Sequence, residues 1–163
     1  MFVTDTTRLP ARTQLVADAL ERAGVRGAVV ALPDSAATAV LAAGALGCEV
    51  GAIANSLVFW ADDRPLLVMT SGRHRVDTAA LARRLHRTAI VRATPDQVRT
   101  ATGQAIGGVS PVGHPDPIET VVDEALADYT RIWAAAGTPH TVFPTSFEEL
   151  VRITGGSVHP VDG

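Results

Sequence analysis

Two apolar runs joined by a short polar turn constrain the fold of this chain more than any other feature. Residues 50–60 and 66–69 are rich in Val, Leu, Ile and Phe, and the turn Asp62–Asp63–Arg64–Pro65 lies between them. This pattern predicts two strands that pair as an antiparallel hairpin. A doubly wound dinucleotide-binding fold is built from parallel strands joined by helical crossovers, so the hairpin argues against that fold.

Helix and strand signals alternate along the rest of the chain without a regular strand–helix–strand rhythm. Further strands are expected at residues 28–32, 88–91, 118–122, 131–135, 141–143 and 158–161. Helices are expected at residues 10–23, at 36–46 with Asp34 or Ser35 as the cap, after the cap Asp77, after the capping box Thr94–Gln97, and from the capping box Ser146–Glu149 to about Gly155.

These elements predict a single mixed α/β (α+β) domain over residues 1–163. Its sheet is expected to be curved, barrel-like and mostly antiparallel or mixed, with helices around it. The helix within residues 1–24 is expected to pack on this domain.

Charge and composition exclude several classes of protein. The net charge is −3, which argues against DNA binding and against a general nucleic-acid coat, although a pocket for the single-stranded end of an RNA is compatible with it. No apolar run approaches the ~20 residues that cross a bilayer, so no membrane association is expected. The first residues lack a signal sequence and Cys48 is the single cysteine, which indicates a cytoplasmic protein. All 14 basic residues are arginine, so lysine-dependent chemistry is excluded.

Common catalytic and metal-binding motifs are absent from the sequence. There is no G-x-G-x-x-G opening a helix, no G-x-S-x-G and no H-E-x-x-H, and the five histidines show no metal-ligand spacing. We therefore expect no metal and no cofactor. His114 is a candidate acid or base, but a solvated loop histidine is the favoured interpretation. Cys48 is expected to be a small buried thiol rather than a nucleophile.

A glycine-rich turn is the strongest candidate for chemistry. Residues 102–111 read TGQAIGGVSP, which places three glycines and a proline between an expected helix and an expected strand. Glycine permits positive φ angles and close approach to the main chain. The N–H groups of Gly108 and Val109 are therefore candidates to bind a phosphate or a developing oxyanion. The alternative is a rigid connection between two core elements.

Two arginines flank a second tight turn. In Gly72–Arg73–His74–Arg75, the guanidinium groups of Arg73 and Arg75 are candidates to attract phosphates toward a cleft. The alternative is a solvated approach to the helix that Asp77 caps.

Considered together, these segments resemble the YbaK/prolyl-tRNA-synthetase-associated editing domain family. The matching residues run in consistent order over roughly residues 25–160 and comprise Thr38–Ala39, Leu46–Gly47, Ile53–Phe59, Leu67–Val68, Gly72 with Arg75–Asp77, Thr102–Gly103, Gly107–Gly113, Val122–Asp123, Ala136–Gly137 and Glu149–Leu150.

The resemblance implies a function. Members of this family hydrolyse wrongly charged aminoacyl-tRNAs, with no metal and no protein nucleophile. Water attacks the ester with help from the ribose hydroxyl of the substrate, while amides of the glycine loop hold the carbonyl. The resemblance thus implies a freestanding aminoacyl-tRNA deacylase whose partners are the acceptor end of mischarged tRNA and, in some cases, an aminoacyl-tRNA synthetase.

The resemblance also implies residue roles. The catalytic residues would be Gly107, Gly108 and Val109, which orient the carbonyl and the oxyanion. The substrate-binding residues would be Asn55, Ser56, Ser110, Pro111, Ala135, Arg73 and Arg75.

Three departures from the family pattern leave alternatives open. Asn55 stands where many members have lysine. Ala135–Ala136–Gly137 stands where some have Ser-Gly-Gly, and Val142 follows where those members have a nearby aspartate. An asparagine side chain offers hydrogen bonds but no charge. The alternatives are a non-catalytic module that binds tRNA ends or a nucleotide, and a hydrolase of small esters or nucleotides on the same scaffold.

Overall fold

Two aspartates with positive φ angles, Asp62 and Asp63, close the hairpin that the sequence predicts. The computed structural model describes residues 9–163, and the hairpin consists of β2 (Ile53–Ala61) and β3 (Arg64–Ser71), which pair antiparallel. Two consecutive left-handed residues match the right-handed twist of the flanking strands, which is why such turns are favoured in hairpins.

The remaining elements alternate along the chain. Helices in the described residues are α1 (Ala11–Arg22), α2 (Ala39–Leu46), α3 (Thr78–Leu85), α4 (Pro95–Thr102) and α5 (Phe147–Thr154), with the 3₁₀ turns η2 (Val50–Ala52) and η3 (Glu124–Asp128). The other strands are β1 (Val30–Ala31), β4 (Ile90–Arg92), β5 (Glu119–Asp123), β6 (Ile132–Ala135), β7 (Thr141–Thr145) and β8 (Ser157–His159).

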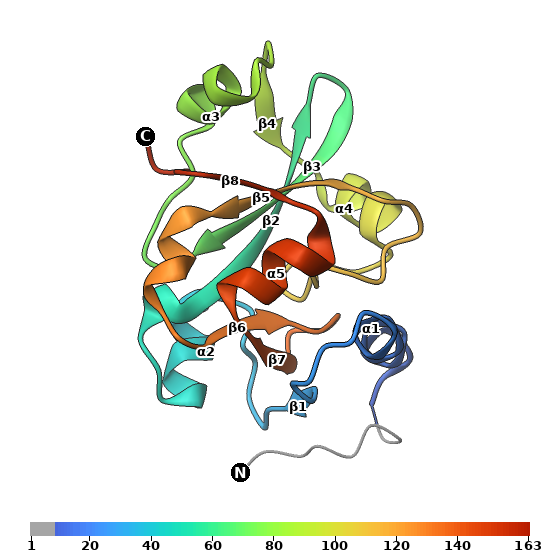
Figure 1. Ribbon diagram of the computed structural model, residues 1–163. Helices are drawn as coiled ribbons and strands as arrows, with labels where there is room; N and C mark the ends of the chain where they lie inside the picture. The colour runs from blue at the N-terminus through green and yellow to red at the C-terminus, as the bar shows by residue number, and fades with distance from the viewer. Residues whose placement is uncertain (1–8) are drawn as a thin grey trace.

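The strands form one mixed sheet in the order β1-β7-β6-β2-β3-β5-β8, with β4 paired to β2. The pairs β1–β7, β6–β7, β2–β3 and β2–β4 are antiparallel, and the pairs β2–β6, β3–β5 and β5–β8 are parallel. In Figure 1, α3 and β4 lie at one end of the sheet, and α1, α2 and β1 lie toward the other. This confirms the predicted mixed α/β domain, except that residues 1–8 of the predicted range lie outside the described residues.

Both faces of the sheet are buried against helices. Leu67 of β3 belongs to a cluster with Val16 of α1 and Leu150 of α5, whereas its neighbour Leu66 packs with Leu81 of α3 on the opposite face. This alternation is the period of two that a strand imposes. Each of these side chains is fully buried. Burial of one such side chain contributes roughly 1.5–3 kcal/mol to the stability of the fold.

Predicted helix caps form at several positions. The Asp77 carboxylate accepts the N–H of Ala80 at 3.0 Å, and Thr94 with Gln97 forms the reciprocal capping box. The Ser146 hydroxyl accepts the N–H of Glu149, so the cap forms there as well.

The Glu149 carboxylate accepts the hydroxyl of Thr145 at 2.7 Å rather than returning to the backbone of Ser146.

The start of α2 differs from the sequence prediction. The helix begins at Ala39 with Thr38 as its cap, not at Ala36 with Asp34 or Ser35. The reason is local: the Ser35 hydroxyl accepts the N–H of Ala37, and the N–H of Ala36 donates to the carbonyl of Pro139 at 2.6 Å. The segment before α2 is thereby held against another loop, and this segment later borders the cavity.

Other strand boundaries shift by a few residues. The run predicted from Val50 begins as η2 before β2, and the last strand ends at His159 because Pro160 has no N–H for the ladder. No helix within residues 9–163 combines the length and apolarity needed to cross a membrane.

Candidate functional site

A cavity of about 240 Å³ opens beside β2, on the edge opposite β3. Its walls come from the segment before α2, from β2, β6 and the end of β4, and from the glycine loop. Five of the predicted site residues line it, namely Asn55, Ser56, Gly107, Val109 and Ala135.

The cavity lies where the sheet has a gap. β6 pairs with β2 only at Ile53 and Ala54, and β4 pairs with the same edge only from Phe59 onward. No strand in the described residues pairs with this edge between Ala54 and Phe59, so the main chain of β2 there faces the cavity.

Main-chain groups of Ser56 and Val58 point to this open edge. The carbonyl of Val58 accepts the N–H of Ala93 at 3.2 Å, which fixes the direction of the Val58 groups. Main-chain directions alternate along a strand, so the groups of Ser56 lie on the same edge. This edge therefore offers hydrogen-bonding groups to a bound molecule.

The glycine loop is held in place through Gly108. Its N–H donates to the carbonyl of Ala105 at 3.2 Å, and its carbonyl accepts the N–H of Gly137 at 2.9 Å. A Cβ on Gly108 would lie 2.4 Å from the carbonyl carbon of Thr138. Gly108 thus packs against the loop before β7 and is not among the residues that line the cavity.

The residues on either side of Gly108 do line the cavity. Gly107 has a φ of +92°, which only glycine adopts readily, and a Cβ there would lie 3.2 Å from Cβ of Ala37. Within residues 9–163, the N–H groups of Gly107 and Val109 make no hydrogen bond. The loop therefore presents donors beside the cavity through these two residues.

Ser110 and Pro111 support the loop from behind the cavity. Both are buried, and the N–H of Ser110 donates to Oε1 of Gln104 at 2.6 Å. The Ser110 hydroxyl accepts the N–H of Val112 at 3.0 Å. Neither residue lines the cavity, so both act on the shape of the loop.

His114, which was predicted to be a solvated loop histidine, is half-buried. Its Nε2 lies 2.8 Å from the carbonyl oxygen of Ser110, to which Nε2–H donates. Burial lowers the pKa of His114, opposed by that hydrogen bond. It does not line the cavity but sits beside a shallower hollow near α1 with Arg12 and Arg22.

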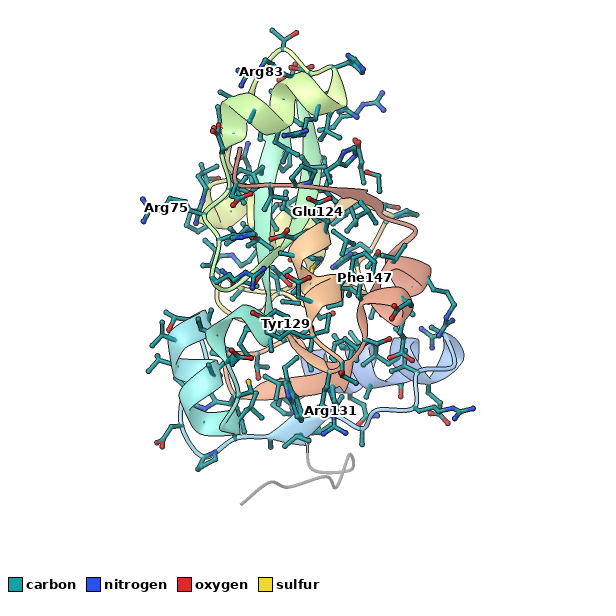
Figure 2. The ribbon with its side chains drawn as sticks, turned by 60° about the vertical axis from the view of Figure 1, so that its left-hand side comes forward. Arg75, Arg83, Glu124, Tyr129, Arg131 and Phe147 are labelled. Atoms are coloured by element: carbon teal, nitrogen blue, oxygen red, sulfur yellow. The ribbon has the colours of Figure 1, made fainter. Side chains whose placement is uncertain are left out.

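Arg73 and Arg75 lie away from the cavity. Arg73 pairs with Asp128 at 2.7 Å, donates to the hydroxyl of Tyr129 at 3.0 Å and lies over the Tyr129 ring. The hydrogen bond to Asp128 is the main cause that raises the pKa of Arg73. Figure 2 shows Arg75 pointing outward from the surface, with Tyr129 lower in the same view and nearer its centre.

A second polar cluster surrounds the buried carboxylate of Asp123. It accepts the N–H groups of Ser71 and Ala125 at 2.9 and 3.0 Å and faces Nδ1 of His74 at 2.9 Å. The other ring nitrogen of His74 lies 3.3 Å from Asp162. This cluster joins β3, β5 and the last residues of the chain. It shares no residue with the lining of the cavity.

Metal-ligand clusters and the Cys48 thiol are the remaining candidates for side-chain chemistry in the described residues. No group of three His, Cys, Asp or Glu side chains in residues 9–163 could hold a metal ion. Burial raises the pKa of the Cys48 thiol, which favours the neutral form. A neutral thiol is a poor nucleophile.

Sequence reasoning missed several residues that line the cavity. They come from segments far apart in the chain and are Thr38, Arg92, Ile106 and Trp133. Arg92 and Trp133 lie in no local motif, because only the pairing of β2 with β4 and β6 brings their strands to the cavity. Ile106 lies within the glycine-rich turn and Thr38 within a segment that resembles the family, but neither was assigned a role from the sequence.

Comparisons with known proteins identify the family of this chain. The family model described as the aminoacyl-tRNA editing domain matches residues 33–153. The proline–tRNA ligase of Leuconostoc mesenteroides is 33% identical over 84 residues, which cover 52% of this chain and 15% of the ligase. The uncharacterized protein YwhH of Bacillus subtilis is 28% identical over 125 residues, covering 76% of this chain and 79% of YwhH.

A solved structure is similar over nearly the whole chain. The crystal structure of "a putative trans-editing enzyme for prolyl tRNA synthetase" has a TM-score of 0.88 and 41% sequence identity. The similarity covers 95% of this chain and 99% of that one. Because the family model matches most of the chain and the folds agree over almost all of it, this chain belongs to the aminoacyl-tRNA editing domain family.

Proposed function

We propose that this protein is an aminoacyl-tRNA deacylase that acts in trans, in the cytoplasm, on the ester bond of mischarged tRNA. Editing is needed because the amino-acid pocket of a synthetase discriminates between amino acids that differ by one methylene by only about 1–3 kcal/mol of binding free energy. The family and the similarity to the structure described as "a putative trans-editing enzyme for prolyl tRNA synthetase" support this proposal.

The observation that carries the proposal is the make-up of the cavity wall. Among the described residues, no histidine, cysteine or carboxylate lines it. Its two side-chain hydroxyls are engaged: Thr38 caps α2, and Ser56 donates to the sulfur of Met69 at 3.2 Å. Such a wall favours attack by water over attack by a protein nucleophile.

In the proposed reaction, the oxygen of water bonds to the ester carbonyl carbon while its proton passes toward the ribose hydroxyl next to the ester. The bond between the carbonyl carbon and the ribose oxygen then breaks as the neighbouring ribose hydroxyl passes a proton to that leaving oxygen, which releases the amino acid and leaves both ribose hydroxyls on the tRNA. The N–H groups of Gly107 and Val109 hold the carbonyl oxygen, and Gly108 keeps the loop in place. Ser110 and Pro111 support the same loop. Loss of one oxyanion donor slows other enzymes about 10²–10³-fold.

The remaining predicted contacts divide by position. Asn55 and Ser56 would contact the terminal adenosine or the aminoacyl group, because both line the cavity. Ala135 would border the amino acid, and its apolar side chain favours an uncharged aminoacyl group. Arg73 and Arg75, both exposed and outside the cavity, would attract phosphates further along the acceptor end.

Release of amino acid from a panel of mischarged tRNAs tests this proposal. Purified protein should accelerate release from at least one of them, and correctly charged tRNAs serve as controls. Release at the spontaneous rate across the panel would overturn the enzymatic proposal.

One alternative is a non-catalytic module, which the neutral side chain of Asn55 in the cavity favours. It predicts binding to an acceptor-stem mimic with no release of amino acid. Turnover of simple esters in the absence of RNA would instead favour a small-ester hydrolase.

A further inference from the structure

The wall of the cavity carries one charged side chain among the described residues, that of Arg92. Arg92 ends β4, at the border of the gap in the sheet. The deeper wall is apolar and includes Ala42, Val109, Ala134 and Val142. A molecule that matches this wall is neutral at one end and anionic at the other.

The guanidinium group of Arg92 is positioned by the sheet. Arg92 and Phe59 are direct partners in the β2–β4 pairing, and Cζ of Arg92 lies 5.7 Å from the centre of the Phe59 ring. Phe59 is only 1% exposed, so its ring is a fixed support for the cation. Asn55 lies four residues before Phe59 on β2, so the side chains of Asn55 and Arg92 project from the same face.

Arg92 also keeps its charge available. Four other arginines in residues 9–163 pair with a carboxylate, namely Arg73, Arg87, Arg99 and Arg152. No carboxylate of residues 9–163 pairs with Arg92 within 4.0 Å. An exposed, positioned guanidinium without an internal partner is suited to an anionic group of a ligand.

We propose that Arg92 binds the phosphate of the 3′-terminal nucleotide while the esterified amino acid occupies the apolar part of the cavity. This inference rests on the proposed function and identifies the residue that distinguishes a nucleotide ester from a simple ester. The planar guanidinium donates two parallel hydrogen bonds to phosphate oxygens. An acidic amino acid is a poorer match, because the deep wall offers it no partner.

Binding of two non-hydrolysable analogues tests the role of Arg92. One is 3′-alanylamino-3′-deoxyadenosine, with an amide in place of the ester, and the other is the same compound with a 5′-phosphate. In calorimetry, the wild-type protein should bind the phosphorylated analogue about 10–100-fold more tightly, and high salt should reduce the difference. Arg92→Gln should reduce the preference to less than about threefold, and Arg92→Lys should be intermediate because it keeps the charge but loses the fork.

Arg99→Gln is the matched control, since Arg99 is also exposed but pairs with Asp96. It should retain the wild-type preference. An unchanged preference in Arg92→Gln, equal affinities of the two analogues for the wild-type protein, or binding of neither analogue would each overturn the inference.

The inference and the proposed function fail in different ways. Phosphate-dependent binding that requires Arg92, with no release from the tRNA panel, would overturn the deacylase and leave the role of Arg92 intact. Release of amino acid from the tRNA panel, with an unchanged preference for the phosphorylated analogue in Arg92→Gln, would support the deacylase and overturn the role of Arg92.

Discussion

The cavity and the Asp123 cluster both border the β2–β3 hairpin, yet they are built in opposite ways. Around Asp123, side chains and main-chain groups satisfy one another, and the carboxylate is fully buried. Beside β2, small residues and a gap in the sheet leave N–H groups of Gly107 and Val109 without a partner in the described residues.

This difference shows that the reactive side chains around Asp123 stabilise the fold, whereas the cavity leaves main-chain groups available to a ligand. A histidine between two carboxylates would attract attention in any sequence, but in this protein it ties the end of the chain to the sheet. The cavity has few such side chains, and its potential lies in main-chain groups. Four substitutions test this contrast, from the largest expected effect to the smallest.

Asp123→Ala should reduce the free energy of unfolding by about 3–5 kcal/mol, because it leaves buried donors of Ser71 and Ala125 without an acceptor. Denaturant titration measures the effect. The control Asp128→Ala breaks only the exposed pair with Arg73 and should change the free energy of unfolding far less, because solvent screens that pair. Equal losses in the two variants would show that the cluster does not stabilise the fold in this way.

Gly107→Ala should slow deacylation about 10²–10³-fold, because the new Cβ meets Ala37 and moves a donor of the loop. It should also cost about 1–2 kcal/mol of stability, since alanine is strained at positive φ. Gly24→Ala is the control: Gly24 has a φ of +76° with open space around its Cβ position. It should show a similar loss of stability with normal deacylation. A normal rate in folded Gly107→Ala would refute the donor role.

Ala135→Val should change specificity rather than stability. The larger side chain narrows the cavity, so kcat/KM should fall more for a large aminoacyl group than for a small one, by about 10–200-fold. The control Ala45→Val alters an exposed position on α2 that does not line the cavity. The ratio of rates across the tRNA panel is the measurement, and an unchanged ratio would remove Ala135 from the specificity wall.

His114→Gln should have the smallest effect, visible as a change in pH dependence. Burial lowers the pKa of His114 in the folded state, so the unfolded chain binds its proton more readily. The neutral form therefore contributes stability that is present above the unfolded pKa of about 6.5 and is lost as the pH falls from there through the lowered folded pKa. The free energy of unfolding, measured between pH 8 and pH 5, should depend less on pH in His114→Gln than in the wild type. Parallel curves would contradict the assignment.

Local signals in the sequence predicted much of the fold, and they did so where neighbouring residues decide the structure. The Asp62–Asp63 turn and the Thr94 capping box are of this kind. The start of α2 was placed too early because the contact of Ala36 with Pro139 joins residues more than a hundred positions apart.

The candidate site divides in the same way. The glycines and Asn55 could be named from the sequence, because their turn and their resemblance to a family are local. Arg92 and Trp133 could not, since only the register of β4 and β6 on β2 brings them to the cavity. That the N–H of Gly108 is already used by Ala105 is likewise visible only in three dimensions.

The open edge of β2 has a practical consequence for following the protein in solution. The amide N–H of Ser56 points away from β3 and toward the cavity. Its exchange with deuterium should be fast in the empty protein and slow once a molecule occupies the gap, while the neighbouring amide of Leu57, bonded within the hairpin, stays slow throughout. Deuterium uptake at this one position would thus report occupancy without any label or any turnover.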